Sequence, residues 1–327
     1  MSILLTGAAG FIGFHVAKAL LERGDRVVGI DNLNDYYDVR LKEARLALLS
    51  AYSGFVFTKL DVADREGVFE LVASHQDLRS VIHLAAQAGV RYSLENPYAY
   101  IDANVMGTLV MLEAARRIDR LTAITYASSS SVYGGNRKQP FAVEDRVDEP
   151  VSLYAATKRS CELLALTYSH LYRLPATGLR FFTVYGPWGR PDMAAYLFTT
   201  AILAGRPIKV FNEGRMARDF TYIDDIVAGT VAAHDRPPSK GVDGIPHRIY
   251  NLGNHHPEKL LEFIAVLERL LGRTAIKELL PLQPGDVPET FADIDASRRD
   301  LGFEPKTTTE VGLARFVEWY KRYHQVD

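Results

Sequence analysis

Short apolar runs alternate with longer amphipathic segments through the first half of the chain. The apolar runs predict strands at residues 3–6, 26–31, 55–61, 80–85, 121–128 and 176–182. Helical periodicity marks the segments between them, at residues 12–23, 68–75, 97–117 and 153–172. Uniformly apolar strands between amphipathic helices are typical of a parallel sheet covered on both faces. Because crossovers between parallel strands are right-handed, the pattern predicts an α/β protein with a doubly wound sheet.

This alternation loosens after about Tyr185. Proline and glycine interrupt short elements there, and clear amphipathic helices are predicted at residues 259–271 and 308–323. A chain of 327 residues is longer than one core usually serves. We therefore expect a first domain over residues 1–175, to which some later segments return. Residues 176–327 would form a smaller α+β lobe that binds the substrate in the cleft between the two.

The composition is that of an ordinary globular enzyme, with 47% hydrophobic and 24% charged residues. The net charge is -2 and there is no basic stripe, so a nucleic-acid partner is not expected. No apolar stretch approaches the ~20 residues that span a bilayer, and no charged leader precedes the first apolar run. We expect a cytoplasmic protein without a membrane partner. The single cysteine, and histidines without ligand spacing, predict that there is no metal site.

The segment Gly7-Ala-Ala-Gly10-Phe-Ile-Gly13 follows the first strand and opens the first helix. Glycines are needed where the backbone turns sharply and approaches a pyrophosphate, whose charge the helix N-terminus stabilises. The second strand ends in Asp31, whose carboxylate can accept both hydroxyls of the adenosine ribose and would repel a 2′-phosphate. The next residue is Asn32, and no arginine follows Asp31 that could pair with such a phosphate. We therefore predict a Rossmann-type sheet that binds NAD rather than NADP.

Further strand ends suit the same cofactor. Asp61 and Val62 could contact the adenine, and the small residues at 84–86 leave room for the nicotinamide half near the backbone. Asn104, on a predicted helix, could hydrogen-bond that segment, although each of these residues could equally serve packing. The predicted cofactor contacts are Gly7, Gly10, Phe11, Ile12, Gly13, Asp31, Asn32, Asp61, Val62, Leu84, Ala85, Ala86, Asn104, Tyr154 and Lys158.

Tyr154 and Lys158 lie one turn apart on the same face of the predicted helix at 153–172. A nearby ammonium favours the phenolate form of a tyrosine, which makes Tyr154 a competent base for a hydroxyl proton and an acid in reverse. Taken alone, this spacing usually marks a surface pair. However, the serine run 128–131 ends the fifth strand, where open α/β sheets place ligands. We therefore predict that Tyr154, Lys158 and Ser129 are catalytic.

Together these motifs resemble the extended branch of the short-chain dehydrogenase/reductase family, which acts mostly on nucleotide sugars. The resemblance rests on the glycine motif, Asp31, the serine run continuing into Val132-Tyr133-Gly134, and Tyr154xxxLys158, and it covers nearly the whole chain. Five shorter segments are similar in sequence to the UDP-glucuronate 4-epimerases. These segments are residues 31–38, 86–91, 180–193, 218–225 and 283–287. In the UDP-galactose 4-epimerases, an asparagine usually stands where this chain has Thr183.

The reactions of this branch begin alike, with loss of the C4 hydroxyl proton and the C4 hydride to give a 4-keto sugar. The 4,6-dehydratases carry Asp-Glu where this chain has Ser130 and Ser131, which disfavours dehydration. The UDP-glucuronate decarboxylases typically carry Glu at the position of Ser131, which weighs less strongly against decarboxylation. The resemblance thus implies an NAD-dependent isomerase that interconverts UDP-glucuronate and UDP-galacturonate. The alternatives are an epimerase of another UDP-hexose, a decarboxylase, or a non-enzymatic NAD-binding sensor or scaffold.

A 4-keto uronate loses carbon dioxide when the bond from C5 to the carboxylate aligns with the ketone π system, so the site must hold this carboxylate. Ser130, Thr183 and Arg190 are candidate donors, although Arg190 could equally pair with Asp192. The resemblance assigns Arg218 to the nucleotide phosphates, and it implies a homodimer formed by the helices at 98–117 and 153–172. The predicted substrate contacts are Arg91, Ser129, Ser130, Thr183, Arg190, Lys209, Val210, Phe211, Arg218 and Asp286.

Overall fold

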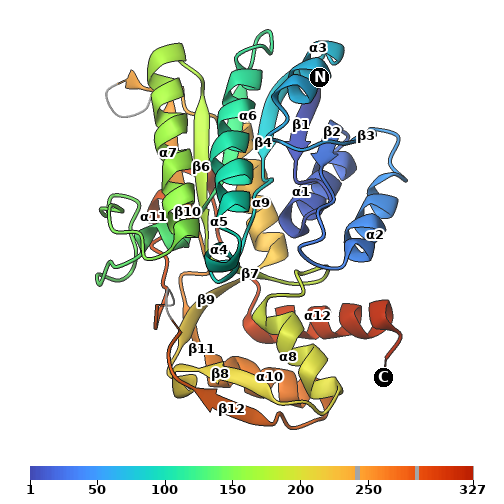
Figure 1. The fold of residues 1–327 in the computed structure, drawn as a ribbon, viewed down its shortest axis with the longest axis vertical. Helices are drawn as coiled ribbons and strands as arrows, with labels where there is room; N and C mark the ends of the chain where they lie inside the picture. The colour runs from blue at the N-terminus through green and yellow to red at the C-terminus, as the bar shows by residue number, and fades with distance from the viewer. Residues whose placement is uncertain (240–243, 284–286, 327) are drawn as a thin grey trace.

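A seven-stranded parallel sheet dominates the computed structural model, which describes residues 1–239, 244–283 and 287–326 (Figure 1). The strand order is β10-β6-β5-β4-β1-β2-β3, and every neighbouring pair is parallel. The predicted doubly wound sheet is therefore confirmed. Six of its strands lie within a few residues of their predicted bounds, and β10 was not among the predicted strands. The strands are β1 (Ser2–Thr6), β2 (Arg26–Asp31), β3 (Phe55–Lys59), β4 (Leu78–His83), β5 (Ala123–Ser129), β6 (Ala176–Phe181) and β10 (His247–Leu252).

Helices cover both faces of this sheet. On one face lie α1 (Phe11–Glu22), α2 (Val39–Leu49) and α9 (Ile223–Asp235), and on the other lie α3 (Arg65–Ser74), α6 (Gly107–Ala115) and α7 (Leu153–Tyr172). The helix predicted at 97–117 is interrupted: α5 (Pro97–Tyr100) continues into a π-helical stretch, Ile101–Met106, before α6. Hydrophobic periodicity does not resolve such a widened turn, which often lies near a functional site. The remaining segments before α7 are α4 (Tyr92–Glu95) and a 3₁₀ turn, Ser130–Tyr133.

The second lobe is the smaller α+β unit at the lower end of Figure 1. It contains a three-stranded sheet, β11-β9-β7, and a two-stranded sheet, β12-β8. Its elements are β7 (Thr183–Tyr185), α8 (Ala194–Leu203), β8 (Ile208–Phe211), a 3₁₀ turn (Asn212–Gly214), β9 (Ala217–Tyr222), β11 (Pro257–Lys259), α10 (Leu260–Leu271), β12 (Lys277–Leu280) and α12 (Thr309–His324). The helix α11 (Asp295–Leu301) instead packs against β10 and α9. Because β6, α9 and β10 return to the large sheet, only part of the chain beyond residue 175 belongs to this lobe, and a domain division there stays a prediction.

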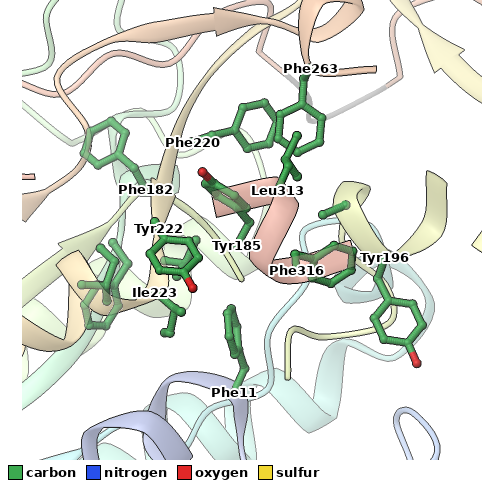
Figure 2. Close-up of a cluster of buried hydrophobic side chains, with 14 of the residues drawn as sticks. Phe11, Phe182, Tyr185, Tyr196, Phe220, Tyr222, Ile223, Phe263, Leu313 and Phe316 are labelled. Atoms are coloured by element: carbon green, nitrogen blue, oxygen red, sulfur yellow. The ribbon is translucent and has the colours of Figure 1, made fainter. Parts of the chain in front are cut away.

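An aromatic core joins the two parts (Figure 2). The rings of Phe220 and Phe263 stack with their centroids 4.0 Å apart, and Tyr185 meets both edge-on. Phe11, which lies within the glycine motif, is buried in the same cluster as Phe316 of α12. Each such side chain contributes roughly 1.5–3 kcal/mol when it leaves water. The glycine motif therefore takes part in the packing of both lobes.

A buried ion pair fixes the carboxyl end of β5. Arg180 donates to both oxygens of Glu162, at 2.8 and 3.0 Å, and both side chains are at most 2% exposed. Ser128 also donates to Glu162, at 2.6 Å, while Arg180 donates to the hydroxyl of Tyr133 at 3.0 Å. Burial alone would raise the pKa of the Glu162 carboxyl, but Arg180 outweighs burial and holds this pKa below its usual value. The pair thus ties α7 and β6 to the serine run.

We expect Glu162→Ala to lower the free energy of unfolding by roughly 3–5 kcal/mol, because it leaves the Arg180 charge buried without its partner. Urea unfolding followed by circular dichroism measures this change. The matched control is Glu22→Ala, which removes an exposed ion pair with Lys18 and a surface hydrogen bond from Tyr52, and should change stability by less than ~1 kcal/mol. Similar losses in the two variants would contradict a stabilising role for the buried pair.

Candidate active site

A pocket opens at the carboxyl edge of the large sheet. Its wall is formed by the residues that end or follow β1, β2, β3, β4, β5 and β6, and by the start of α7. Carboxyl ends of parallel strands are where open α/β sheets bind ligands. The pocket is therefore the candidate active site.

The glycine motif shapes one end of this pocket. Gly7 has a φ of +73°, and a Cβ there would lie 2.8 Å from the backbone nitrogen of Ala85. A Cβ on Gly13 would lie only 2.0 Å from the carbonyl oxygen of Gly7, so neither position accepts a side chain. Gly10 precedes the first turn of α1, whose free N–H groups favour an anion. This bare turn fits the pyrophosphate of a dinucleotide.

Asp31 lies at the next strand end, where a ribose is expected. Its carboxylate accepts from the backbone N–H groups of Ala9, at 3.2 Å, and Leu33, at 2.9 Å. The ammonium of Lys42 lies 3.8 Å from Asp31 and lines the pocket. Burial lowers the pKa of Lys42, while Asp31 opposes that shift. Asn32 donates to Asp61 at 2.8 Å, and Lys42 donates to the side-chain oxygen of Asn34 at 2.8 Å.

Most predicted cofactor contacts line this one pocket, and Asn104 is the exception. The residues that line it are Gly7, Gly10, Phe11, Ile12, Gly13, Asp31, Asn32, Asp61, Val62, Leu84, Ala85, Ala86, Tyr154 and Lys158. Asn104 is buried in the π-helical stretch, where its amide bonds the backbone N–H and C=O of Gln87 at 2.8 and 3.1 Å. The structure thus gives Asn104 a supporting position behind the pocket wall.

The three predicted catalytic residues also line the pocket. Ser152 caps α7 by accepting from the N–H of Ala155 at 3.1 Å, which places Tyr154 and Lys158 in the first two turns. Lys158 donates to the carbonyl of Ala127 at 3.0 Å. Ser129 donates to the hydroxyl of Ser131 at 3.1 Å. A phenol, an ammonium and a hydroxyl therefore share one cavity with the glycine motif.

Besides Ser129, four predicted substrate contacts line the same pocket: Ser130, Thr183, Arg190 and Arg218. Arg190 makes the alternative pairing, since its Nε and Nη2 donate to the two oxygens of Asp192 at 2.9 and 2.6 Å. Burial lowers the pKa of Arg190, but Asp192 outweighs burial and raises it. The pair still lines the pocket through Arg190, and Tyr36 and Tyr154 contribute to the raised pKa of Arg190.

The segment Lys209–Phe211 does not line the pocket within the described part of the chain. Val210 is fully buried in the core of the second lobe, Lys209 is exposed, and Phe211 packs under the guanidinium of Arg91 at 4.3 Å. Contacts of these four residues with a uracil or phosphate stay predictions. Asp286 lies outside the described residues.

Sequence reasoning missed several residues of the pocket wall. Asn34 and Tyr36 follow Asp31, Lys42 comes from α2, and Gly89 follows β4. The segments 31–38 and 86–91 carried the family resemblance, and this was the available signal for all of these residues except Lys42. Lys42 reaches the pocket because α2 packs against α1 and brings this side chain to Asp31 at the end of β2, which no local pattern shows.

The described residues hold no cluster of three or more His, Cys, Asp or Glu side chains that could bind a metal. Cys161 lies on the buried face of α7, and burial raises the pKa of its thiol. Across the same described ranges, no helix combines the length and apolar character needed to cross a membrane.

Comparisons with known proteins agree with this geometry. "Probable UDP-glucuronate 4-epimerase" of Rhizobium meliloti (strain 1021) is 50% identical over 99% of this chain and 98% of its own length. UDP-glucuronate 4-epimerase 4 of Arabidopsis thaliana is 49% identical over 100% of this chain and 77% of its own. The crystal structure of UDP-glucuronic acid 4-epimerase from Bacillus cereus, in complex with UDP-glucuronic acid and NAD, superposes with a TM-score of 0.90. That structure is 37% identical and covers 99% of this chain and 100% of its own.

Residues 3–253, well over half of the chain, match a family defined by its dinucleotide-dependent chemistry. The match spans the glycine motif, Asp31, the serine run and the Tyr154–Lys158 pair. The chain therefore belongs to the NAD dependent epimerase/dehydratase family.

Proposed function

We propose that this chain is an isomerase, a UDP-glucuronate 4-epimerase that binds NAD and interconverts UDP-glucuronate and UDP-galacturonate. The observation that carries the proposal is the convergence of Tyr154, Lys158 and Ser129 with the glycine motif and Asp31 in one pocket. The relatives named above support the choice of substrate. Gly7, Gly10 and Gly13 would hold the pyrophosphate of NAD, and Asp31 the adenosine ribose.

The chain's own residues carry the proton chemistry. Bound NAD accepts the hydride from C4 of the sugar and later returns it. Tyr154 takes the proton of the C4 hydroxyl, and the Lys158 ammonium stabilises the phenolate that results. Lys158 is held for this task by the carbonyl of Ala127. The Ser129 hydroxyl lies in the same cavity and donates to the C4 oxygen as its proton leaves and returns.

The 4-keto uronate that forms is a β-keto acid and loses its carboxylate easily. When the bond from C5 to the carboxyl carbon breaks, its electron pair enters the ketone as an enolate and carbon dioxide leaves. Ser130, Thr183 and Arg190 line the pocket and can hold the carboxylate so that this bond stays near the carbonyl plane. Elimination of water would need an acid and a base at positions 130 and 131, and this chain has Ser130 and Ser131 there.

Epimerisation requires the keto sugar to present its other face before the hydride returns. The nucleotide must stay anchored while the sugar swings about the pyrophosphate. Arg218 suits this role because its Nη1 donates to the backbone carbonyls of Ala217 and Pro288, each at 3.0 Å. Its guanidinium is thus fixed to the second lobe while it lines the pocket.

We also propose a homodimer built on α7 and the neighbouring helical stretch at 97–106, which contact each other. Large apolar side chains are exposed on both: Tyr98, Ile101, Met106, Leu163, Leu166 and Leu171. Exposed apolar patches of this kind mark association sites, and two such helix pairs can form a four-helix bundle. The proposal includes a cytoplasmic location and no nucleic-acid, membrane or metal partner.

Incubation of the purified protein with UDP-glucuronate, without added NAD, should yield UDP-galacturonate and no pentose product by NMR. The cofactor is regenerated in each cycle, so the NAD that co-purifies suffices. UDP-xylose or a UDP-4-keto-pentose as the main product would instead identify a decarboxylase. No conversion after NAD is added would favour another UDP-hexose or a non-enzymatic NAD-binding protein.

Tyr154→Phe should lower turnover by roughly 10²–10⁴-fold, because the C4 proton loses its acceptor. The amount of NAD bound per subunit should stay that of the wild type, since the glycine motif and Asp31 are unchanged. The NMR assay measures turnover, and extraction of the cofactor measures binding. Wild-type activity in this variant would exclude Tyr154 as the base.

Leu166→Glu should convert the dimer to a monomer, because it places a charge within the apolar surface of α7. Leu261→Glu is the matched control: Leu166 is 39% exposed and Leu261, on α10, is 43% exposed. Sedimentation velocity separates the two species. A dimer in both variants would show that α7 is not the interface.

A further inference from the structure

The loop between β7 and α8, residues 186–193, carries Arg190 and is fixed to the cofactor-binding half at two backbone points. The carbonyl of Pro187 accepts from Nε2 of His15 at 2.9 Å, and the carbonyl of Trp188 accepts from Nη2 of Arg45 at 2.6 Å. Burial lowers the pKa of His15 to about 4, so its imidazole is neutral at pH 7. Arg45 is fully buried, and its Nη1 donates to the carbonyl of Ala9 within the glycine motif at 2.7 Å. The backbone of this loop therefore keeps its place without help from Tyr36 or Asp192.

The side chains at the end of the loop form a separate relay. Nε and Nη2 of Arg190 donate to the two oxygens of Asp192, and the hydroxyl of Tyr36 donates to Oδ2 of Asp192 at 3.1 Å. Burial, followed by the charge of Asp192, raises the pKa of Tyr36, so its hydroxyl keeps its proton. Among the described residues, Nη1 of Arg190 makes no hydrogen bond. One side of the guanidinium is thus held by Asp192, while Arg190 still lines the pocket.

Tyr36 is itself confined. Its ring packs against Tyr92 with the centroids 4.8 Å apart, and a Cβ on Gly89 would lie 2.7 Å from its hydroxyl oxygen. Gly89 has a φ of +105°, so the backbone passes this hydroxyl where a side chain would not fit. The hydroxyl is therefore set between the segment after β4 and Asp192.

We propose that Tyr36 and Asp192 are positioning residues that hold Arg190 in the orientation that retains the substrate carboxylate, an inference that rests on the proposed function. A free arginine side chain samples many rotamers, and the two bonds to Asp192 remove this freedom before the substrate binds. A guanidinium that turns would let the carboxylate turn with it, and the bond from C5 would then align with the ketone. The relay therefore controls whether the 4-keto uronate is epimerised or loses carbon dioxide.

The negative charge of Asp192 gives the relay a second, separable effect. The Arg190–Asp192 pair is nearly neutral as a unit, so it attracts an anionic substrate less than Arg190 alone would. Replacing Asp192 by a neutral residue of the same shape should strengthen the attraction between Arg190 and the anionic substrate. The same replacement should loosen the orientation of the Arg190 guanidinium. If Asp192 only stabilised the fold, its replacement would not both raise the affinity for UDP-glucuronate and lower the share of the epimerised product.

The first test compares Tyr36→Phe with Tyr52→Phe. UDP-glucuronate labelled with carbon-13 at C6 is added to each NAD-loaded protein, and NMR follows labelled UDP-galacturonate and labelled carbon dioxide. Loss of the bond from Tyr36 to a charged partner should raise the ratio of decarboxylation to epimerisation about tenfold. Tyr52→Phe cuts a hydroxyl bond to Glu22 on the surface and should keep the wild-type ratio. A wild-type ratio in Tyr36→Phe would overturn the inference while leaving the epimerase activity established.

The second test uses Asp192→Asn in the same assay, with initial rates at several UDP-glucuronate concentrations. We expect a lower KM together with a raised share of carbon dioxide. A loss of total activity with unchanged KM and unchanged product ratio would assign Asp192 to folding alone and overturn the inference. If the wild type itself forms no UDP-galacturonate, the proposed function fails, and that outcome differs from a failure of the relay.

Discussion

All seven strands of the large sheet run in one direction, so their carboxyl ends meet at one edge. This constraint brings together the glycine turn after β1, the carboxylate that ends β2, the small residues after β4 and the serines that end β5. These segments are far apart in the chain, yet each reaches the pocket because of strand direction alone. The free N–H groups of α1 open onto the same edge and add a partial positive charge where an anionic ligand would lie. Binding and chemistry therefore share one cavity.

The other wall of the cavity depends on packing rather than on a hydrogen-bonded sheet. Phe11 belongs to the glycine motif and to the aromatic core of the second lobe, and Arg45 joins Ala9 to Trp188 through one guanidinium. These contacts make a rigid frame around a substrate that has to turn over inside it. Such a frame restricts motion to the sugar ring, because the cofactor motif and the loop with Arg190 are held together.

The strands, and the place of Tyr154 and Lys158 in the pocket, could be predicted because each depends on local signals. Apolar runs, glycines at a strand end and a Tyr–Lys spacing of one turn need no knowledge of the rest of the chain. The position of Lys42, the π-helical turn around Asn104 and the bond from Tyr36 to Asp192 depend on which segments the fold brings together. The pairing of Arg190 was left open for the same reason, since periodicity does not show which carboxylate its guanidinium meets. Val210 was predicted to contact the substrate from the segment at 209–211; its side chain is buried in the core of the second lobe, and this contact stays a prediction.

The return of β6 and β10 to the large sheet has a consequence for synthesis on the ribosome. The first five strands emerge early, but β6 pairs with β10, which ends at Leu252. At about 5–20 residues per second, the nascent chain waits on the order of several seconds between these two strands. During that interval the outer edge of β6 presents unpaired N–H and C=O groups, a template for pairing with another chain. This edge is covered only once residues 247–252 have been made and pair with β6.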